Sequence, residues 1–269
     1  MKRIKVGDIV SRKSYNNDIL FRVKRILNKK NDKIVILSGV IERVEADCNI
    51  EDLELASSDR VNNDLLYIQG RIDNKAGNKL KGKRTQYIIT GKILHLDGDR
   101  KYSEKSYRYY KKLGLNAIVK NIPEYKQSKV VYNLLKTYEP DILIITGHDG
   151  MIKNSTRYND LGNYRNSKYF IETVKEARKY DKEKNNNLVI FAGACQSYFE
   201  ALISAGANFA SSPGRILIDF IDPLIVAEKV AITEKYKYIT IDDIEDELRD
   251  GKKGINGIGA NGKMYRIIK

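Results

Sequence analysis

"NLVIFAGACQS" (187–197) and "DILIITGHDG" (141–150) are short apolar runs that each end on glycine and then present a reactive side chain. The first run leads to Cys195 and the second to His148. Apolar runs of this length, bounded by turn residues, are typical of strands that are buried on both faces of a parallel sheet. The two stretches therefore predict central strands of an α/β fold.

The sequence around these runs alternates between strand and helix patterns from Tyr87 onward. Strands are expected at 87–97, 116–122, 141–147, 187–193 and 208–213, and helices near 103–113, 124–138, 166–182, 198–205 and 219–233. This order predicts a mainly parallel sheet flanked by helices. Reacting groups in such a sheet gather at the carboxyl ends of the strands. The glycine-rich stretch 254–263 is expected to be a C-terminal loop.

The chain before Tyr87 has a different pattern. Several short runs with alternating or β-branched residues occupy 1–55 and predict a small SH3-like β-barrel. Residues 56–86 are rich in Ser, Asn, Asp, Gly and Lys, which favours a linker or a long surface loop. The sequence thus predicts a β module, a connecting segment, and an α/β domain over 87–269.

The formal net charge of +14 over 269 residues indicates a basic surface. Lysines and arginines are spread along the chain, and no recognition helix, zinc finger or aromatic RNA-binding signature accompanies them. A generally cationic surface is therefore favoured over a dedicated nucleic-acid site, although nucleic acid or an acidic assembly stays open as a partner.

Hydropathy and cysteine content indicate the compartment. No apolar run approaches the roughly 20 residues that span a bilayer, and the N-terminus lacks the apolar stretch of a signal peptide. The chain has two cysteines, Cys48 and Cys195, too few for a secreted disulfide framework. The sequence therefore predicts a cytoplasmic protein with free thiols and no membrane partner.

Cys195 and His148 together predict nucleophilic chemistry. If neighbouring strands carry them, both side chains lie at the same edge of the sheet. An imidazole, and a helix expected to begin near Gln196, would favour the thiolate over the thiol. The imidazole would also protonate the leaving amine, and glycines at 147, 150 and 193 would let backbone N–H groups approach an oxyanion.

The other histidine and cysteine are expected to be structural. His95 ends the first strand of the α/β part without a cysteine beside it, and Cys48 belongs to the β module, where packing is the favoured role. No C-x-x-C, H-x-x-x-H or carboxylate cluster suggests a metal, and no phosphate-loop order suggests a nucleotide. We therefore expect neither a metal nor a cofactor.

The "TGHDG" and "GACQS" blocks resemble the caspase, gingipain and clostripain group of cysteine peptidases. Nearly the whole chain resembles the YabG family of sporulation-specific proteases, through the "VGDIV" opening, "TGHDG", "AGACQSYFEALISAGANFASSP" and the later "IDP". The resemblance implies a caspase-like domain over 87–269, with Cys195 as nucleophile and His148 as general acid and base. It also implies action in the mother cell of a sporulating bacterium, in its cytoplasm or at the forming spore coat, on coat and germination-related proteins.

The same resemblance implies an oxyanion hole of backbone N–H groups. Cys195 would supply one donor, and either Asp149 or Gly150 the other, because Asp149 stands where the caspase-like group has glycine. The Asp149 side chain is expected to be a solvated turn carboxylate, with orientation of His148 as the alternative.

Specificity is the least defined part of the expected site. Several relatives cleave after arginine, and clostripain-like enzymes have an Asp two residues before the nucleophile, where this chain has Gly193. A preference for Arg or Lys would need another acid. Gly193, Ser211 and Ser212 are candidate residues of the substrate cleft.

Two function classes follow from the sequence. The favoured one is a cysteine endopeptidase with a Cys-His dyad that processes proteins during sporulation. The alternative is a basic protein that binds nucleic acid or a spore assembly, in which the α/β domain is a scaffold and Cys195 is inert.

Overall fold

The computed structural model describes residues 3–29, 32–79, 87–152 and 157–267. The chain divides into two compact units, Met1–Asn78 and Lys79–Lys269. The predicted division into functional domains at 55 and 86 stays a prediction.

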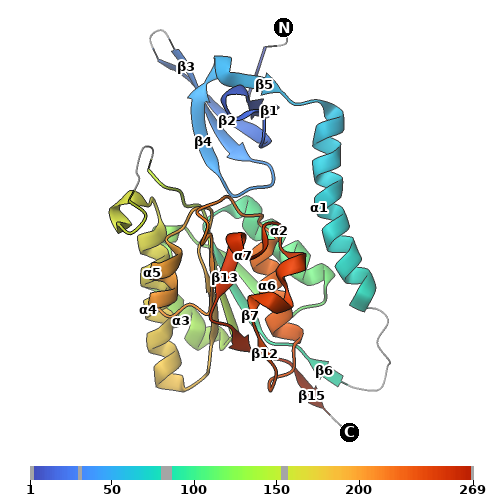
Figure 1. Cartoon of the computed structure of the whole chain (residues 1–269). Coiled ribbons are helices and arrows are strands. Elements are labelled where there is room, and N and C mark those ends of the chain that lie inside the picture. The colour runs from blue at the N-terminus through green and yellow to red at the C-terminus, as the bar shows by residue number, and fades with distance from the viewer. Residues whose placement is uncertain (1–2, 30–31, 80–86, 153–156, 268–269) are drawn as a thin grey trace. The chain divides into compact units, whose positions relative to one another are not determined.

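The first unit is built on an antiparallel sheet with the order β4-β3-β2-β1-β5 (Figure 1). Its strands are β1 (Ile9–Arg12), β2 (Phe21–Lys29), β3 (Asp32–Gly39), β4 (Glu45–Asn49) and β5 (Leu53–Leu55). Alternating side chains on one face form a small core around Val10, Val35 and Leu37, each fully buried. This period of two explains why the sequence pattern predicted strands here.

The expected SH3-like barrel is not confirmed. Over the described residues, β4 pairs with β3 alone and β5 with β1 alone, so the sheet stays open. Closure of a barrel depends on pairing between distant strands, which local alternation does not determine.

The expected linker or surface loop contains a long helix, α1 (Ser58–Lys79). Its first turn is tied to the sheet by Arg60, whose guanidinium donates to the carbonyl oxygens of Asn17 and Asp18. The polar composition suggested a loop, but an apolar stripe through Val61, Leu65 and neighbouring residues has helical spacing.

The second unit contains a six-stranded sheet with the order β13-β11-β10-β9-β7-β8. The strands are β7 (Ile93–Asp97), β8 (Ala117–Asn121), β9 (Ile142–Thr146), β10 (Val189–Ala192), β11 (Phe209–Ser211) and β13 (Ile255–Gly257). All neighbours are parallel except β11 and β13. The fold is therefore α/β with a mainly parallel sheet, as the sequence predicted.

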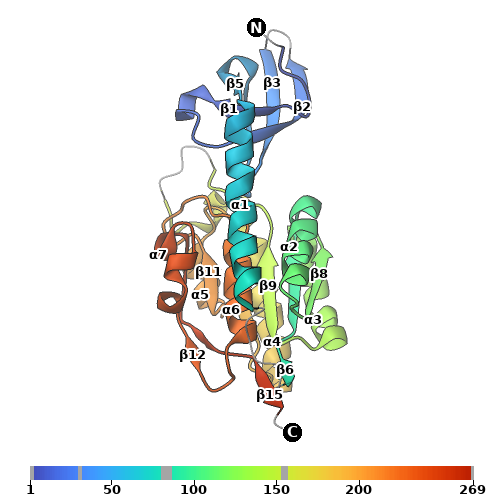
Figure 2. The same cartoon turned by 90° about the vertical axis from the view of Figure 1, so that its right-hand side faces the viewer.

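Helices cover both faces of this sheet. The long ones are α2 (Arg100–Lys112), α3 (Glu124–Tyr138), α4 (Ser167–Lys184) and α6 (Asp222–Ile232), and the short ones are α5 (Phe199–Ser204) and α7 (Gly251–Gly254). Helices α3, α4 and α5 pack on one face, and α2 and α6 on the other. Figure 2 looks onto the face covered by α2 and α6.

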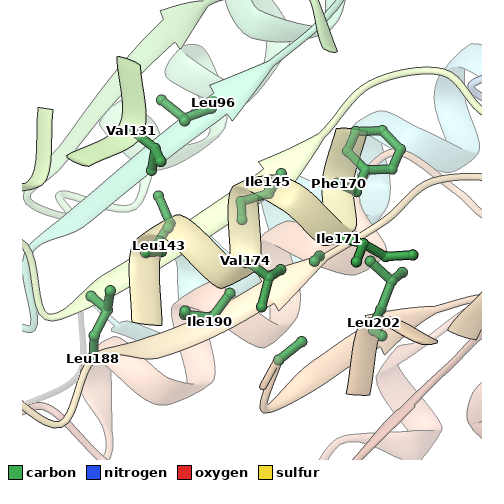
Figure 3. Close-up of a cluster of buried hydrophobic side chains, with 14 of the residues drawn as sticks. Leu96, Val131, Leu143, Ile145, Phe170, Ile171, Val174, Leu188, Ile190 and Leu202 are labelled. Atoms are coloured by element: carbon green, nitrogen blue, oxygen red, sulfur yellow. The ribbon is translucent and has the colours of Figure 1, made fainter. Parts of the chain in front are cut away.

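The core between the sheet and α3, α4 and α5 is apolar. Figure 3 shows Leu143, Ile145 and Ile190 from the strands packed against Val174 and Leu202 from the helices, all fully buried. Each such side chain contributes roughly 1.5–3 kcal/mol through burial. This packing fixes β9 and β10 as rigid supports for the loops that follow them.

Element boundaries follow local signals. Helix α3 begins after Pro123 and ends at Glu139, which adopts a left-handed conformation (φ 43°) before Pro140. The expected first strand, 87–97, is instead divided into β6 (Tyr87–Ile89) and β7, and β6 pairs with β15 (Tyr265–Ile267).

The expectation of a loop over 254–263 was wrong. The stretch contains β13, the antiparallel edge of the large sheet, and β14 (Ala260–Asn261), which pairs with β12 (Tyr238–Ile239). Pairing with distant strands overrides the low strand propensity of glycine and asparagine.

Candidate active site

The loops after β9 and β10 meet at the carboxyl edge of the large sheet. The two strands are parallel neighbours, with Ile145 opposite Ala192. Beyond the strands, the Met151 N–H donates to the Gln196 side-chain oxygen over 3.3 Å. The structure thus brings together the two chain segments that carry His148 and Cys195, as expected from the sequence.

His148 is held by carboxylates at both its main chain and its ring. Its N–H donates to Glu124 Oε1 (2.7 Å), and its Nε2 lies 2.9 Å from Asp99 Oδ2. The ring packs edge-on against Tyr102, with 6.0 Å between centroids. The side chain is 17% exposed, so the imidazole is oriented but accessible.

Asp99 is the carboxylate that the sequence reasoning missed. It follows β7 and caps α2, since its Oδ1 accepts the N–H groups of Lys101 and Tyr102. Burial alone would raise the pKa of Asp99, but His148 and the two amides together hold that pKa well below its usual range. Asp99 is therefore a fixed anion beside the imidazole.

A second aspartate fixes the position of the first. Asp97 Oδ1 accepts the Asp99 N–H (2.9 Å), and its Oδ2 accepts the hydroxyl of Thr146 (2.9 Å). Asp97 ends β7 and Asp99 follows two residues later, while Thr146 ends β9, two residues before His148. The hydrogen bonds therefore set the spacing between Asp99 and His148.

Gly147 makes room for Glu124. A Cβ at position 147 would lie 2.3 Å from Glu124 Oε1, closer than any real contact. Gly147 thus leaves space for the Glu124 carboxylate that accepts the His148 N–H. The sequence had suggested a different role, in which this glycine lets backbone N–H groups approach an oxyanion.

The Asp149 carboxylate joins three segments and is not solvated as expected, since the residue is only 8% exposed. Its Oδ1 accepts the N–H groups of Gly150 (2.9 Å) and Asn166 (2.8 Å). Its Oδ2 accepts the hydroxyls of Ser167 (2.5 Å) and Ser197 (2.9 Å). Burial raises the pKa of the Asp149 carboxyl, and the hydrogen bonds oppose that rise. Asp149 therefore ties the His148 loop to α4 and to the Cys195 loop.

Cys195 lies in a turn after β10 and is completely buried. The Ile218 N–H donates to its Sγ over 3.4 Å, and the thiol faces the Ile218 carbonyl oxygen at 3.8 Å. The sulfur thus contacts both main-chain polar groups of Ile218.

The expected helix start near Gln196 was wrong. Helix α5 begins at Phe199 and has six residues, so Cys195 does not lie in its first turn. Gln196 itself adopts a left-handed backbone conformation (φ 55°), which cannot continue a helix. Any activation of the thiol must therefore come from groups other than the α5 dipole.

The three predicted cleft residues are interior. Gly193 has φ 112° and packs against Leu202, while Ser211 and Ser212 are fully buried. The Ser212 hydroxyl accepts the Gln196 N–H (3.1 Å) and donates to the Ile216 carbonyl (2.7 Å). In this structure these residues support the Cys195 loop and line no open surface.

His95 and Cys48 have the structural surroundings that the sequence suggested. His95 is fully buried, with Nδ1 3.1 Å from the Tyr110 hydroxyl and Nε2 2.7 Å from the Thr146 hydroxyl. Cys48 belongs to the core of the first unit, and burial raises the pKa of its thiol.

Ranges 3–29, 32–79, 87–152 and 157–267 hold no cluster of three or more His, Cys, Asp or Glu side chains that could bind a metal ion. Within the same ranges no helix has the length and apolarity to cross a membrane.

Comparisons with known proteins identify the family of the chain. The model of the family described as YabG peptidase U57 matches residues 5–268. The sporulation-specific protease YabG of Bacillus subtilis (strain 168) is 38% identical over 281 aligned residues, which cover 97% of each chain. The chain belongs to the YabG peptidase family. No solved structure matches it.

Membership of the YabG family makes the chain a peptidase by family and supports a role in sporulation. It does not define which residues react. Asp99 could have been found by applying the strand-end rule to "ILHLDGD" as it was applied to the other two strands. Glu124 and Asn166, which hold the backbone of His148, lie on helices far along the chain and give no local signal.

Proposed function

We propose that this YabG family member is a cysteine endopeptidase with a caspase-like domain over 87–269, in which Cys195 is the nucleophile and His148 the general acid and base. The observation that carries the proposal is the placement of both residues directly after two neighbouring parallel strands. The Asp99 contact to His148 supports it further, because a catalytic imidazole needs a fixed orientation.

The ring contacts suggest how the proton moves. With Nε2 of His148 bonded to Asp99, Nδ1 is the nitrogen that takes the proton of Cys195. The thiolate attacks the peptide carbonyl carbon, and the imidazolium then gives its proton to the leaving amine. Water hydrolyses the resulting thioester with His148 as base, which restores the thiol.

The oxyanion of each tetrahedral intermediate needs backbone N–H donors. We assign one to Cys195 and one to the Asp149–Gly150 turn. The Gly150 N–H is already directed at Asp149 Oδ1, which makes the Asp149 N–H the better second donor. Substrate-cleft roles for Gly193, Ser211 and Ser212 would require movement of the segment that buries them.

The substrates we propose are spore coat and germination-related proteins, processed in the mother-cell cytoplasm or at the forming coat. The sporulation name of the relative supports this setting. The proposed reaction uses only protein groups, with no metal or cofactor.

Cleavage assays with three variants test the proposal. Wild type, Cys195→Ala, His148→Ala and the matched control Cys48→Ala are incubated with a peptide library and with denatured coat proteins, after circular dichroism confirms folding. We expect activity in wild type and Cys48→Ala, and a loss of about 10³-fold or more in the other two. Equal activity in all four would refute the dyad. Inactivity of all four, with salt-dependent nucleic-acid binding, would favour the alternative of a binding protein.

A further inference from the structure

The segment Ser212–Ile218 lies directly on Cys195. Its Ile218 main chain contacts Sγ, and its Ile216 carbonyl accepts the Gln196 N–H over 3.1 Å. Gly214, in the middle of the segment, is exposed, whereas Cys195 is completely buried. A peptide carbonyl cannot reach the thiol while this segment stays in place.

Arg215, within that segment, is held in a cage of aromatic rings. Its guanidinium carbon lies 5.6–5.8 Å from the ring centroids of Tyr158, Tyr164 and Tyr198. Its Nε donates to the Tyr164 hydroxyl (2.8 Å), and it forms an ion pair with Glu200. The Arg215 side chain is only 11% exposed, whereas Glu200 is 61% exposed, so the guanidinium is largely buried in a cage that is open on the Glu200 side.

The cage belongs to parts of the chain that surround the Cys195 loop. Tyr198 and Glu200 follow Cys195 by three and five residues, and Tyr164 precedes α4. Tyr164 and Tyr198 are stacked, with 5.1 Å between ring centroids and 12° between planes. The Arg215 guanidinium therefore anchors the segment Ser212–Ile218 to the Cys195 loop, which this segment covers.

Backbone strain gathers at this contact. Gln196, Ser212 and Arg215 all have positive φ, at 55°, 63° and 55°, in a region that non-glycine residues rarely adopt. Such residues are found where surrounding contacts hold them, often in segments that switch. Movement of the segment would release this backbone strain. The Arg215 contacts oppose that movement.

We propose that Ser212–Ile218 is a latch that closes over Cys195 and that Arg215, bound in the tyrosine and Glu200 cage, keeps it closed. The closed latch then lowers the rate at which the folded peptidase acts, because the latch must open before a substrate reaches the thiol. This inference rests on the proposed role of Cys195, but its test reads the exposure of the thiol and not peptidase activity.

Thiol alkylation provides that test. The full chain is incubated with iodoacetamide, and the modification of Cys195 and Cys48 is followed separately by mass spectrometry of their peptides. Cys48, buried in the first unit, serves as the internal reference. We expect Arg215→Ala to raise the Cys195 rate about tenfold with the Cys48 rate unchanged, and Arg215→Lys to give a smaller rise, because lysine keeps the charge without the planar fork.

Arg178→Ala is the matched control. Arg178 is also largely buried and donates to the carbonyls of Gly206 and Leu188, at the opposite end of β10. We expect it to leave the ratio of the Cys195 and Cys48 rates unchanged. The latch proposal would be overturned if Cys195 in folded Arg215→Ala were alkylated as slowly as in wild type. It would also be overturned if Arg178→Ala raised the Cys195 alkylation rate as much as Arg215→Ala does. Rapid alkylation of Cys195 in Arg215→Ala, without any peptidase activity, would support the latch and contradict the proposed function instead.

Discussion

The loops that carry His148 and Cys195 differ in how they are held, although they follow neighbouring strands of one sheet. The His148 loop is fixed by three carboxylates, from Asp99, Glu124 and its own Asp149, and the imidazole stays partly exposed. The Cys195 loop shares only Asp149 of these, through Ser197, is otherwise held by hydroxyls and backbone groups, and is sealed by a later segment. The difference indicates that the His148 imidazole is oriented and accessible in the folded protein, whereas the Cys195 thiol is not accessible.

The substitution Asp99→Asn is expected to have the largest effect on activity, because it changes the carboxylate that orients His148. Asparagine can still cap α2, but it no longer supplies a negative charge to Nε2 of His148. We expect kcat/KM to fall by about 10³-fold, mainly through kcat, because orientation of the imidazole and stabilisation of its charged form are lost. Steady-state kinetics on a cleaved peptide would measure this.

Glu104→Gln is the control for that experiment. Glu104 lies on the same helix and pairs with Arg100 at the surface. We expect its kinetics to match wild type. A kcat for Asp99→Asn close to that of wild type would show that the Asp99 contact has no role in the reaction.

The two loops should also differ in what they contribute to stability. Asp149→Asn replaces a buried acceptor of four hydrogen bonds and should lower the free energy of unfolding by about 3 kcal/mol. Ser212→Ala, in the sealing segment, removes one neutral hydroxyl and should cost about 1 kcal/mol. Urea denaturation followed by circular dichroism would compare them, and equal losses would contradict the distinction between the loops.

The sequence was most informative where local pattern and structure agree. The apolar runs of β9 and β10 predicted their positions, and the expected helix over 124–138 coincides with α3. The strand-end rule then predicted that His148 and Cys195 lie at one edge of the sheet.

Features that depend on distant pairing were missed. β13 exists because the glycine-rich stretch near 255 pairs with β11, and the sheet of the first unit stays open because β4 and β5 do not meet. Asp99 lies 49 residues before His148, and the strand-end rule places it at the same edge of the sheet but does not indicate its contact with His148. Burial of Cys195 by Ile218 is likewise a tertiary effect that spacing cannot indicate.

Covalent trapping tests the central claim, a Cys195 nucleophile that His148 activates, most directly. Wild type and His148→Ala are treated with a peptidyl ketone that alkylates active-site thiols, and each cysteine peptide is examined by mass spectrometry. The account predicts an adduct on Cys195 alone in wild type, with Cys48 unmodified, and a far slower reaction in His148→Ala. Loss of peptidase activity without an adduct on Cys195, or an equal rate of labelling in the two proteins, would contradict it.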